Sequence, residues 1–541
     1  MMSKLRCWSL LIILTVLTAC TSSTSLQKRV FRYNIAGGLE TLDPAFAKNL
    51  SIMWNVHLIF NTLTEVNSNL EVVPSLAKSW TVSEDGLRYT FIIRDSVYFH
   101  DNPVFAGGKG RKMTAHDVQY SFERIIDPQT ASSGAWIFND KVREDNPFEA
   151  LDDTTFIIHL RSPFGPLPEM LSMPYCSVVP REVVARWGKD FRSHPCGTGP
   201  FRFEYWDEGN TLVLHRHPNY WEKDSEGQAL PYLEAVQVSF NDTKATEFLL
   251  FMQGELHFIN GLDGSFKDMV LTKSGKLKGD FAQKIRLQKL SYLNTEYIGI
   301  LMDTSLAVAQ NSALKYKKVR QAINYAIDRQ KIITYFRNGV GVPAVAGFIP
   351  NGMPGTEQRF AEPYKYNPQK AMALLNEAGF PGGQGLPVII LQCPEVNVDV
   401  CNFVATQLND IGLKTRVQVV QPGLLRQEMS RGQAGFFKAQ WIADYPDAET
   451  YLAFFYSKYP SPPNYTRFHN TTFDKWYNRA MNTNDERERL TIYARMDSLI
   501  MAEAPVVPLF YDEIMHFTQL NVEGFEQNPL NIIDLKKVRI R

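Results

Sequence analysis

The sequence has few of the residues from which metal centres and nucleic-acid surfaces are built. Its 541 residues include only ten His and six Cys, which leaves little material for a metal-rich protein. Lys and Arg together number 57, as do Asp and Glu, so the basic excess of most nucleic-acid binders is missing. We therefore expect no metal, no cofactor and no nucleic-acid partner.

Signatures of catalysis are also missing. The sequence has no Gly-x-Ser-x-Gly elbow, no Walker loop and no His-Glu-x-x-His helix. His215 and His217 would share one face of a strand, but no acidic partner for a metal is evident beside them. Asp152 and Asp153 are adjacent, so in an extended chain their carboxylates point apart. We predict that the chain is not an enzyme.

What is present is an ordinary globular composition, with 44% hydrophobic and 21% charged residues. The length exceeds the roughly 250–300 residues that one hydrophobic core serves, so we expect two or three lobes. Strand patterns at 88–93 and 155–160 alternate with helical patterns at 54–63 and 319–336. Thr114 with Asp117 predicts a capping box at a helix start. This interleaving predicts an α/β fold with layered sheets.

The first residues have the form of an export signal. Lys4 and Arg6 precede an apolar run at 8–17, which is shorter than the about 20 residues of a membrane-spanning helix. The run ends at Cys20, after small residues and before a Ser/Thr-rich stretch, and this resembles the lipobox of bacterial lipoproteins. The resemblance implies a signal peptide at 1–19, lipid on Cys20, a tether at 20–30 and anchorage to a bacterial membrane. A plain secretory signal with a chance Cys is the alternative.

Export would place four further cysteines in an oxidising compartment. Cys176, Cys196, Cys393 and Cys401 allow three pairings, of which Cys176–Cys196 with Cys393–Cys401 is the simplest because it closes short loops. Free buried thiols are the alternative.

Short motifs over nearly the whole mature chain follow one recognisable order. They lie at 41–44, 73–80, 97–101, 114–121, 197–201, 217–221 and 319–329. Together they resemble the extracytoplasmic solute-binding proteins of peptide ABC transporters, the dipeptide- and oligopeptide-binding proteins. One departure is that Asn102 stands where the family usually has Gly, and that residues 103–112 look inserted.

The resemblance implies a two-lobed periplasmic-binding-protein-like (class II) fold that closes on its ligand. Lobe I would comprise 31–71, 196–290 and 511–541, with an extra subdomain at 72–195, and lobe II would comprise 291–510. The implied function is a monomeric lipoprotein that captures di- or oligopeptides and delivers them to a membrane permease driven by an ATPase. Another solute (a nickel complex, haem or an oligosaccharide) or an exported peptide-processing hydrolase are the alternatives.

The resemblance also implies four ligand-binding residues, two of them in the segment 440–446. Asp444 matches the acid that meets a peptide ammonium, and Lys438 matches an Arg that pairs with a peptide carboxylate in some members. Trp441 and Tyr297 are candidates for the aromatic walls of the cleft. The alternatives are a loop-capping Asp444, a solvated Lys438 and core packing for both aromatic residues.

Overall fold

The computed structural model describes residues 29–357, 359–360 and 363–541. Among these residues, no helix combines the length and the apolar character that crossing a bilayer requires. The predicted signal peptide and Cys20 lie outside the described residues.

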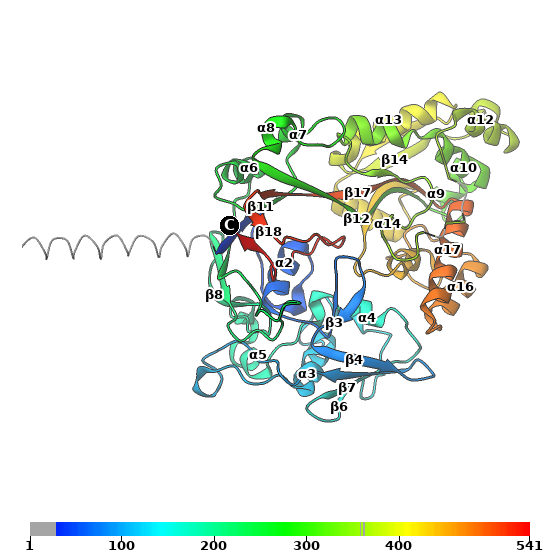
Figure 1. Cartoon of the computed structure of the whole chain (residues 1–541). Coiled ribbons are helices and arrows are strands. Elements are labelled where there is room, and N and C mark those ends of the chain that lie inside the picture. Colours follow the sequence, from blue (N-terminus) through cyan, green and yellow to red (C-terminus); the bar gives the residue numbers. More distant parts are fainter. Residues whose placement is uncertain (1–28, 358, 361–362) are drawn as a thin grey trace, which may run out of the picture.

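One large mixed sheet runs through most of the molecule (Figure 1). Its central strands are β12 (Ile285–Ile300) and β17 (Val506–Gln519), which pair antiparallel over most of their length. The strands beside β17 are, in order, β11 (Phe258–Asn260), β1 (Val30–Asn34), β10 (Ala235–Ser239), β9 (Thr211–Arg216) and β8 (Phe201–Asp207). The strands beside β12 are β16 (Phe436–Ile442), β14 (Ile389–Cys393) and β15 (Thr415–Val419).

The two long strands connect the regions that the sequence assigns to lobe I and lobe II. The expected boundaries at 290/291 and 510/511 fall inside β12 and β17. The pairing of these strands shifts its register between Ser291 and Thr295, directly after the first boundary. A register shift bends a ladder locally, so this is where the sheet departs from regularity between the two regions.

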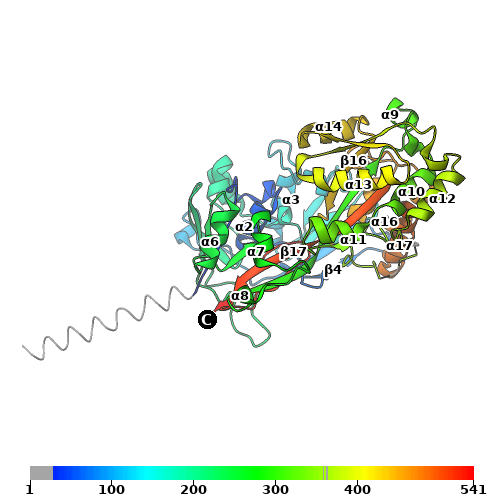
Figure 2. The same cartoon turned by 90° about the horizontal axis from the view of Figure 1, so that it is seen from above.

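Helices cover the sheet on both sides of this connection. Near lobe I lie α2 (Leu50–Ile59), α6 (Lys244–Met252), α7 (Gly264–Val270) and α8 (Gly279–Ala282). Near lobe II lie α10 (Lys317–Ala326), α12 (Pro368–Glu377), α13 (Val398–Asp410), α14 (Pro422–Arg431), α16 (Thr471–Met481) and α17 (Glu486–Glu503). Seen from above, β17 runs between the two groups (Figure 2).

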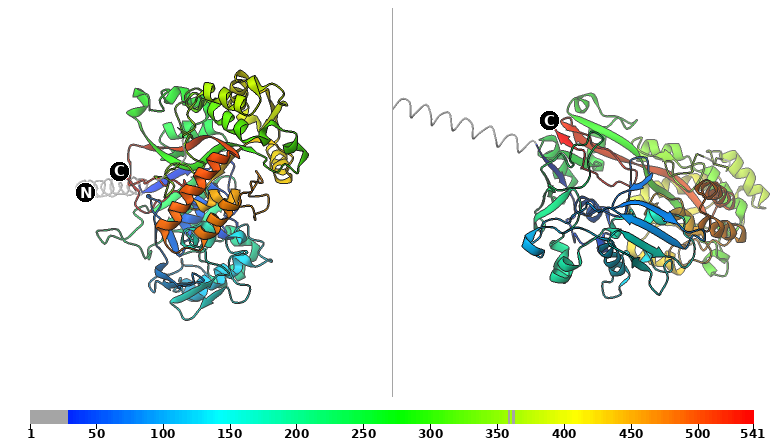
Figure 3. Two further views of the ribbon diagram at one scale, coloured as in Figure 1. Left: turned by 90° about the vertical axis from the view of Figure 1, so that its right-hand side faces the viewer. Right: turned by 60° about the horizontal axis from the view of Figure 1, so that its bottom comes forward.

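A smaller antiparallel sheet forms a separate layer, as expected for the extra subdomain. Its order is β4 (Ala77–Val82), β5 (Arg88–Ile93), β7 (Thr155–His159) and β6 (Phe148–Ala150), and it lies below α16 and α17 in the left view of Figure 3. The helix α3 (Ala115–Ile126) packs on it through Phe122, whose ring centroid lies 5.6 Å from that of Phe148. The expected capping box of Thr114 and Asp117 is confirmed.

The segment 103–112, which looks inserted, is held in place by ion pairs. Arg111 reaches Asp117 of α3 at 2.6 Å and Glu182 of α5 (Arg181–Trp187) at 2.7 Å. The insertion is therefore fastened to two helices of the subdomain.

The expected helix at 319–336 is wrong as one element. The helix α10 ends at Ala326, Ile327 is extended, and a short new helix starts after Asp328, whose side chain caps it. The break places the buried Arg329 where it donates to the carbonyls of Asn324 and Pro508. Because a buried guanidinium needs acceptors, helical continuity yields to its hydrogen bonds.

The expected disulfides are absent, and all four cysteines are free and buried. The thiols of Cys176 and Cys196 are directed at different carbonyls, those of Met170 and His100. In the second pair the thiols are neighbours, and a hydrogen bond from Cys401 lowers the pKa of the Cys393 thiol. The alternative of free buried thiols therefore describes the structure, and oxidation of Cys393 with Cys401 stays a prediction.

Candidate functional site

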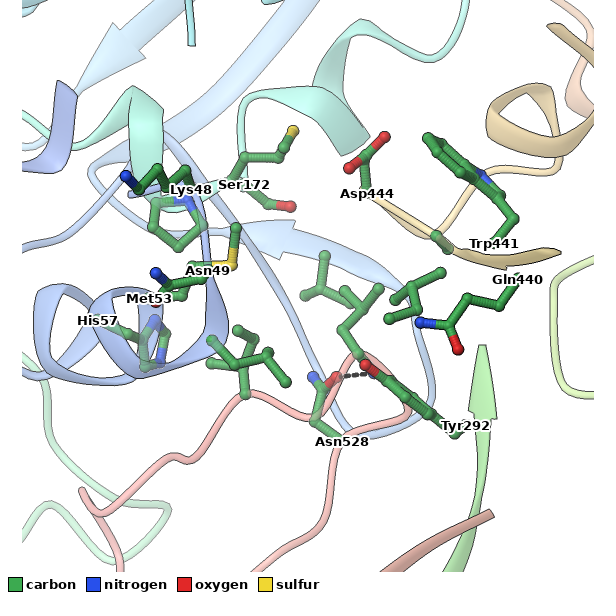
Figure 4. A pocket seen from close by; sticks show the side chains of 18 of the residues that line it. Lys48, Asn49, Met53, His57, Ser172, Tyr292, Gln440, Trp441, Asp444 and Asn528 are labelled. Carbon is green, nitrogen blue, oxygen red and sulfur yellow. Dashed lines mark hydrogen bonds between the residues drawn. The ribbon is translucent and has the colours of Figure 1, made fainter. Parts of the chain in front are cut away.

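A cavity of about 1050 Å³ lies between the two regions that β12 and β17 connect. One wall comes from α2, from the hairpin of β2 (Thr64–Val66) and β3 (Val72–Pro74), and from the C-terminal segment 526–537. The other comes from β12, β16, α14 and the residues that follow β16. Asp444 and Trp441 project from this second wall, opposite Met53 and His57 of α2 (Figure 4). A volume of this size is typical of a small-molecule site.

Asp444 stands on a firmly anchored turn. β16 ends at Ile442, and the Ala443 amide donates to the Leu293 carbonyl of the neighbouring strand β12 at 2.8 Å. The next residues turn inward, where Tyr445 donates to the buried carboxylate of Glu449. Within the described chain, the Asp444 carboxylate has neither an ion pair nor a hydrogen bond from another side chain. The turn is thus held by its neighbours, while the Asp444 carboxylate faces the cavity.

The electrostatic surroundings of Asp444 disfavour its charge. The side chain keeps accessible surface in the cavity, but two protein walls enclose it. Desolvation raises the pKa of Asp444 to about 7, and the Glu449 carboxylate adds to the rise. A carboxylate of this kind gains from a cation brought to it, because no described side chain forms an ion pair with it.

Aromatic side chains continue the same wall. Trp441 is partly buried, and its ring centroid lies 4.3 Å from that of Phe454 in an edge-on arrangement. The Phe454 centroid lies 6.3 Å from that of Tyr465, and all three residues line the cavity. Trp441 therefore stands where the sequence placed it, in an aromatic surface rather than alone.

Tyr297 reaches the cavity only marginally. It is 2% exposed, and its ring packs edge-on against Phe348 with centroids 5.0 Å apart. Its position in β12 turns the side chain into the core, so the structure favours the core-packing alternative, although the residue touches the cavity lining.

Lys438 differs from both sequence alternatives, since it is neither solvated nor free for a ligand. Its side chain is 2% exposed, and its ammonium is paired with Glu296 of β12. The ammonium also donates to the Ala439 carbonyl at 2.8 Å. Because its charge is already balanced inside the protein, Lys438 is a poor partner for a ligand carboxylate.

A second internal cation lies on the facing wall, and no sequence pattern indicates it. Lys536 is 7% exposed and lies 2.8 Å from Glu65, 3.0 Å from Glu222 and 3.5 Å from Asp534. His57, Glu65 and Asp534 each bring a potential metal ligand within 4.8 Å of the others. The Lys536 ammonium already occupies the neighbourhood of these carboxylates, so a side chain supplies the positive charge there.

Comparison with protein families finds one matching description, "Bacterial extracellular solute-binding proteins, family 5 Middle", over residues 71–463. The match covers the subdomain, the helices from α10 to α14 and the turn that carries Asp444. It thus spans more than half of the chain.

Individual relatives are distant but match along nearly the full length. The glutathione-binding protein GsiB of Shigella dysenteriae serotype 1 is 25% identical over 526 residues, covering 95% of each chain. The structure of HbpA2 from Haemophilus parasuis has a TM-score of 0.82 at 24% identity, covering 95% of this chain and 100% of that one. DppA from Helicobacter pylori, solved with the peptide STSA, has a TM-score of 0.72 at 24% identity, covering 96% and 99%. The two structures support the same overall fold, the mixed α/β periplasmic-binding-protein fold with an extra antiparallel sheet.

Proposed function

The chain belongs to the family 5 bacterial extracellular solute-binding proteins, and from this premise we propose that its ligand is a short peptide with a free ammonium group. Membership makes the chain a non-catalytic binding protein of an ABC importer that works in the periplasm or outside the cell. The proposal concerns the ligand, its place in the cavity and the anchoring of the protein.

The observation that carries the proposal is the unpaired acid in the cavity. Asp444 faces the space between the walls, and its raised pKa expresses the cost of its charge there. A peptide ammonium would remove that cost by pairing with the carboxylate. A neutral oligosaccharide would leave Asp444 without a cation, so the site favours an amine-bearing ligand.

The rest of the cavity suits a peptide of variable sequence. Trp441, Phe454 and Tyr465 form an apolar wall that contacts side chains without selecting one. Relatives offer related chemistry, since GsiB is named for glutathione and the DppA structure contains a peptide. Binding would close the two walls on the ligand around β12 and β17, and a permease would then receive it.

Anchoring through lipid on Cys20 is part of the same proposal. The Ser/Thr-rich residues after Cys20 would act as a tether that lets the folded part reach a permease in the membrane. Radiolabelled palmitate incorporated into the wild-type protein but not into Cys20→Ser would support the anchor, and equal labelling would contradict it.

The test of the ligand is the substitution Asp444→Asn, which removes the charge and keeps the shape. Titration calorimetry at pH 8 with alanine peptides of two to five residues should show a loss of about 2–3 kcal/mol, or roughly 30- to 150-fold in Kd. N-acetylated peptides, which lack the ammonium, should bind the wild type and Asp444→Asn equally weakly.

The matched control is Asp410→Asn, which removes one negative charge at the end of α13, outside the cavity lining. It should bind peptides as the wild type does. Equal affinity of Asp444→Asn and the wild type for free peptides would overturn the ammonium role, and a wild type that binds no peptide would overturn the peptide proposal itself.

A further inference from the structure

The peptide proposal leaves the carboxylate end of the ligand without a partner. Lys438, which the sequence suggested, is buried and paired with Glu296. A partner must instead line the cavity, carry a positive charge and lack an acid of its own. Arg426 of α14 meets these conditions.

The helical spacing of α14 directs Arg426 toward the cavity. Four of its residues line the cavity: Pro422, Leu425, Arg426 and Met429. Their spacing of three, four and seven residues places them on one face of the helix. Leu425 and Met429 are 3% and 7% exposed, whereas Arg426 is exposed and is the charged member of this face.

The sequence around Arg426 explains why its guanidinium is free. A helical residue pairs with side chains three or four positions away, and here those positions hold Pro422, Gly423, Met429 and Ser430, none of them acidic. The nearby acid Glu428 lies on another face, where it accepts a hydrogen bond from Gln392 at 2.8 Å. Within the described residues, no ion pair involves Arg426.

Arg426 lies near Tyr465, on the same wall of the cavity as Asp444. Trp441, three residues before Asp444, is followed by Phe454 and Tyr465 in ring-to-ring steps of 4.3 and 6.3 Å. Tyr465 is close enough to Arg426 for the guanidinium to lower the pKa of its phenol, which desolvation raises overall.

We propose that Arg426 binds the C-terminal carboxylate of a short peptide whose ammonium is at Asp444. The guanidinium offers a planar fork of donors that matches a carboxylate. An acid and a base on one wall of the cavity would select a zwitterionic peptide. The proposal depends on peptide binding at Asp444, and its test separates the two.

The experiment compares trialanine with trialanine amide, which differs only in lacking the C-terminal charge. Calorimetry at pH 8 should show that the wild type prefers the acid by at least about tenfold, and that Arg426→Gln binds both forms equally, at the wild-type affinity for the amide. Arg426→Lys, which keeps the charge without the fork, should retain part of the preference. Arg431→Gln, which changes the last residue of the same helix outside the cavity lining, should keep all of it.

The outcomes distinguish this proposal from the one on which it depends. If the wild type binds acid and amide equally, or if Arg426→Gln keeps the preference, the role of Arg426 is wrong although peptide binding stands. If neither form binds the wild type, both proposals fall. Unchanged melting temperatures of the three variants would show that a loss of preference is not a loss of folding.

Discussion

Lys438 and Asp444 lie six residues apart, and both line the cavity, yet the surroundings of their charges are opposite. Lys438 is buried in β16 and paired with Glu296, whereas Asp444 follows the same strand and has no cation near it in the described chain. A charge with an internal partner contributes to the folded state, and its removal leaves the partner buried and unpaired. A charge without one makes the empty protein less stable and the bound complex more stable.

On the facing wall of the cavity, Lys536 is paired inside the protein, as Lys438 is. Lys536 is surrounded by Glu65, Glu222 and Asp534, so its charge also belongs to the fold. Asp444 and Arg426 belong to the charges that line the cavity without an ion pair in the described residues. This contrast predicts which substitutions in one cavity change stability and which change binding.

The largest expected effect is on stability, from Lys438→Met. The substitution strands the Glu296 carboxylate in the core and should lower the free energy of unfolding by about 3–5 kcal/mol in urea denaturation. The double variant Lys438→Met with Glu296→Gln should recover most of this loss, because no unpaired charge is left. Lys414→Met, at an exposed position before β15, should change it by less than about 0.5 kcal/mol.

Peptide binding by the double variant tests whether Lys438 also contacts the ligand. If Lys438 served a peptide carboxylate, the double variant would stay weak in binding even with its stability restored. We expect the double variant to bind trialanine with a Kd within about threefold of the wild-type value. A loss of affinity greater than tenfold would show that Lys438 binds the ligand.

The next effect is the pH dependence of peptide binding. Asp444 has a pKa of about 7 in the empty cavity, so below pH 7 a proton must leave before the ammonium can pair with the carboxylate. The affinity should therefore fall about tenfold per pH unit well below 7, and by about 50-fold between pH 7 and pH 5. Calorimetry across this range would measure it.

Two controls assign the pH effect to Asp444. N-acetylated peptide should show no such slope, and Asp444→Asn should bind free peptide weakly with a flat profile. Above about pH 8 the peptide ammonium itself loses its proton, so the affinity should decline again. A wild-type affinity that is flat from pH 5 to pH 7 would contradict the raised pKa or the ammonium pairing.

The sequence anticipated the features that local signals determine. The helix start at Thr114 follows from a side-chain cap within three residues, and it is confirmed. The motif around Trp441 placed this residue and Asp444 on the cavity wall, because a short contiguous segment carries both. Arg426 lies on a recognisable helical face, but nothing in the sequence indicates which face meets the cavity.

What sequence reasoning missed depends on partners far along the chain. Lys438 pairs with a residue 142 positions earlier, which only the pairing of β16 with β12 brings near. Arg329 breaks an expected helix because its acceptor on Pro508 is 179 positions away. The local sequence around each of these residues does not indicate such a contact. Whether a charged residue in the cavity is paired can therefore be read only from the folded structure.

The smallest expected effect concerns the empty protein and separates the two explanations of Asp444. A folded-state pKa of about 7, above the unfolded value of about 3.9, means that folding favours the protonated carboxyl, so this stabilisation is lost as the pH rises through 7. Because the side chain is partly open to solvent, removing the charge with Asp444→Asn should raise stability at pH 8 by only about 1 kcal/mol, and should leave it nearly unchanged at pH 5. Thermal denaturation at both pH values without peptide would measure the difference.

A loop-capping Asp would give the reverse sign, because losing a cap costs about 0.5–2 kcal/mol. A lower melting temperature of Asp444→Asn at pH 8 would therefore show that Asp444 stabilises the folded protein, as Lys438 does. It would contradict the role of Asp444 as the acid that binds the ligand ammonium.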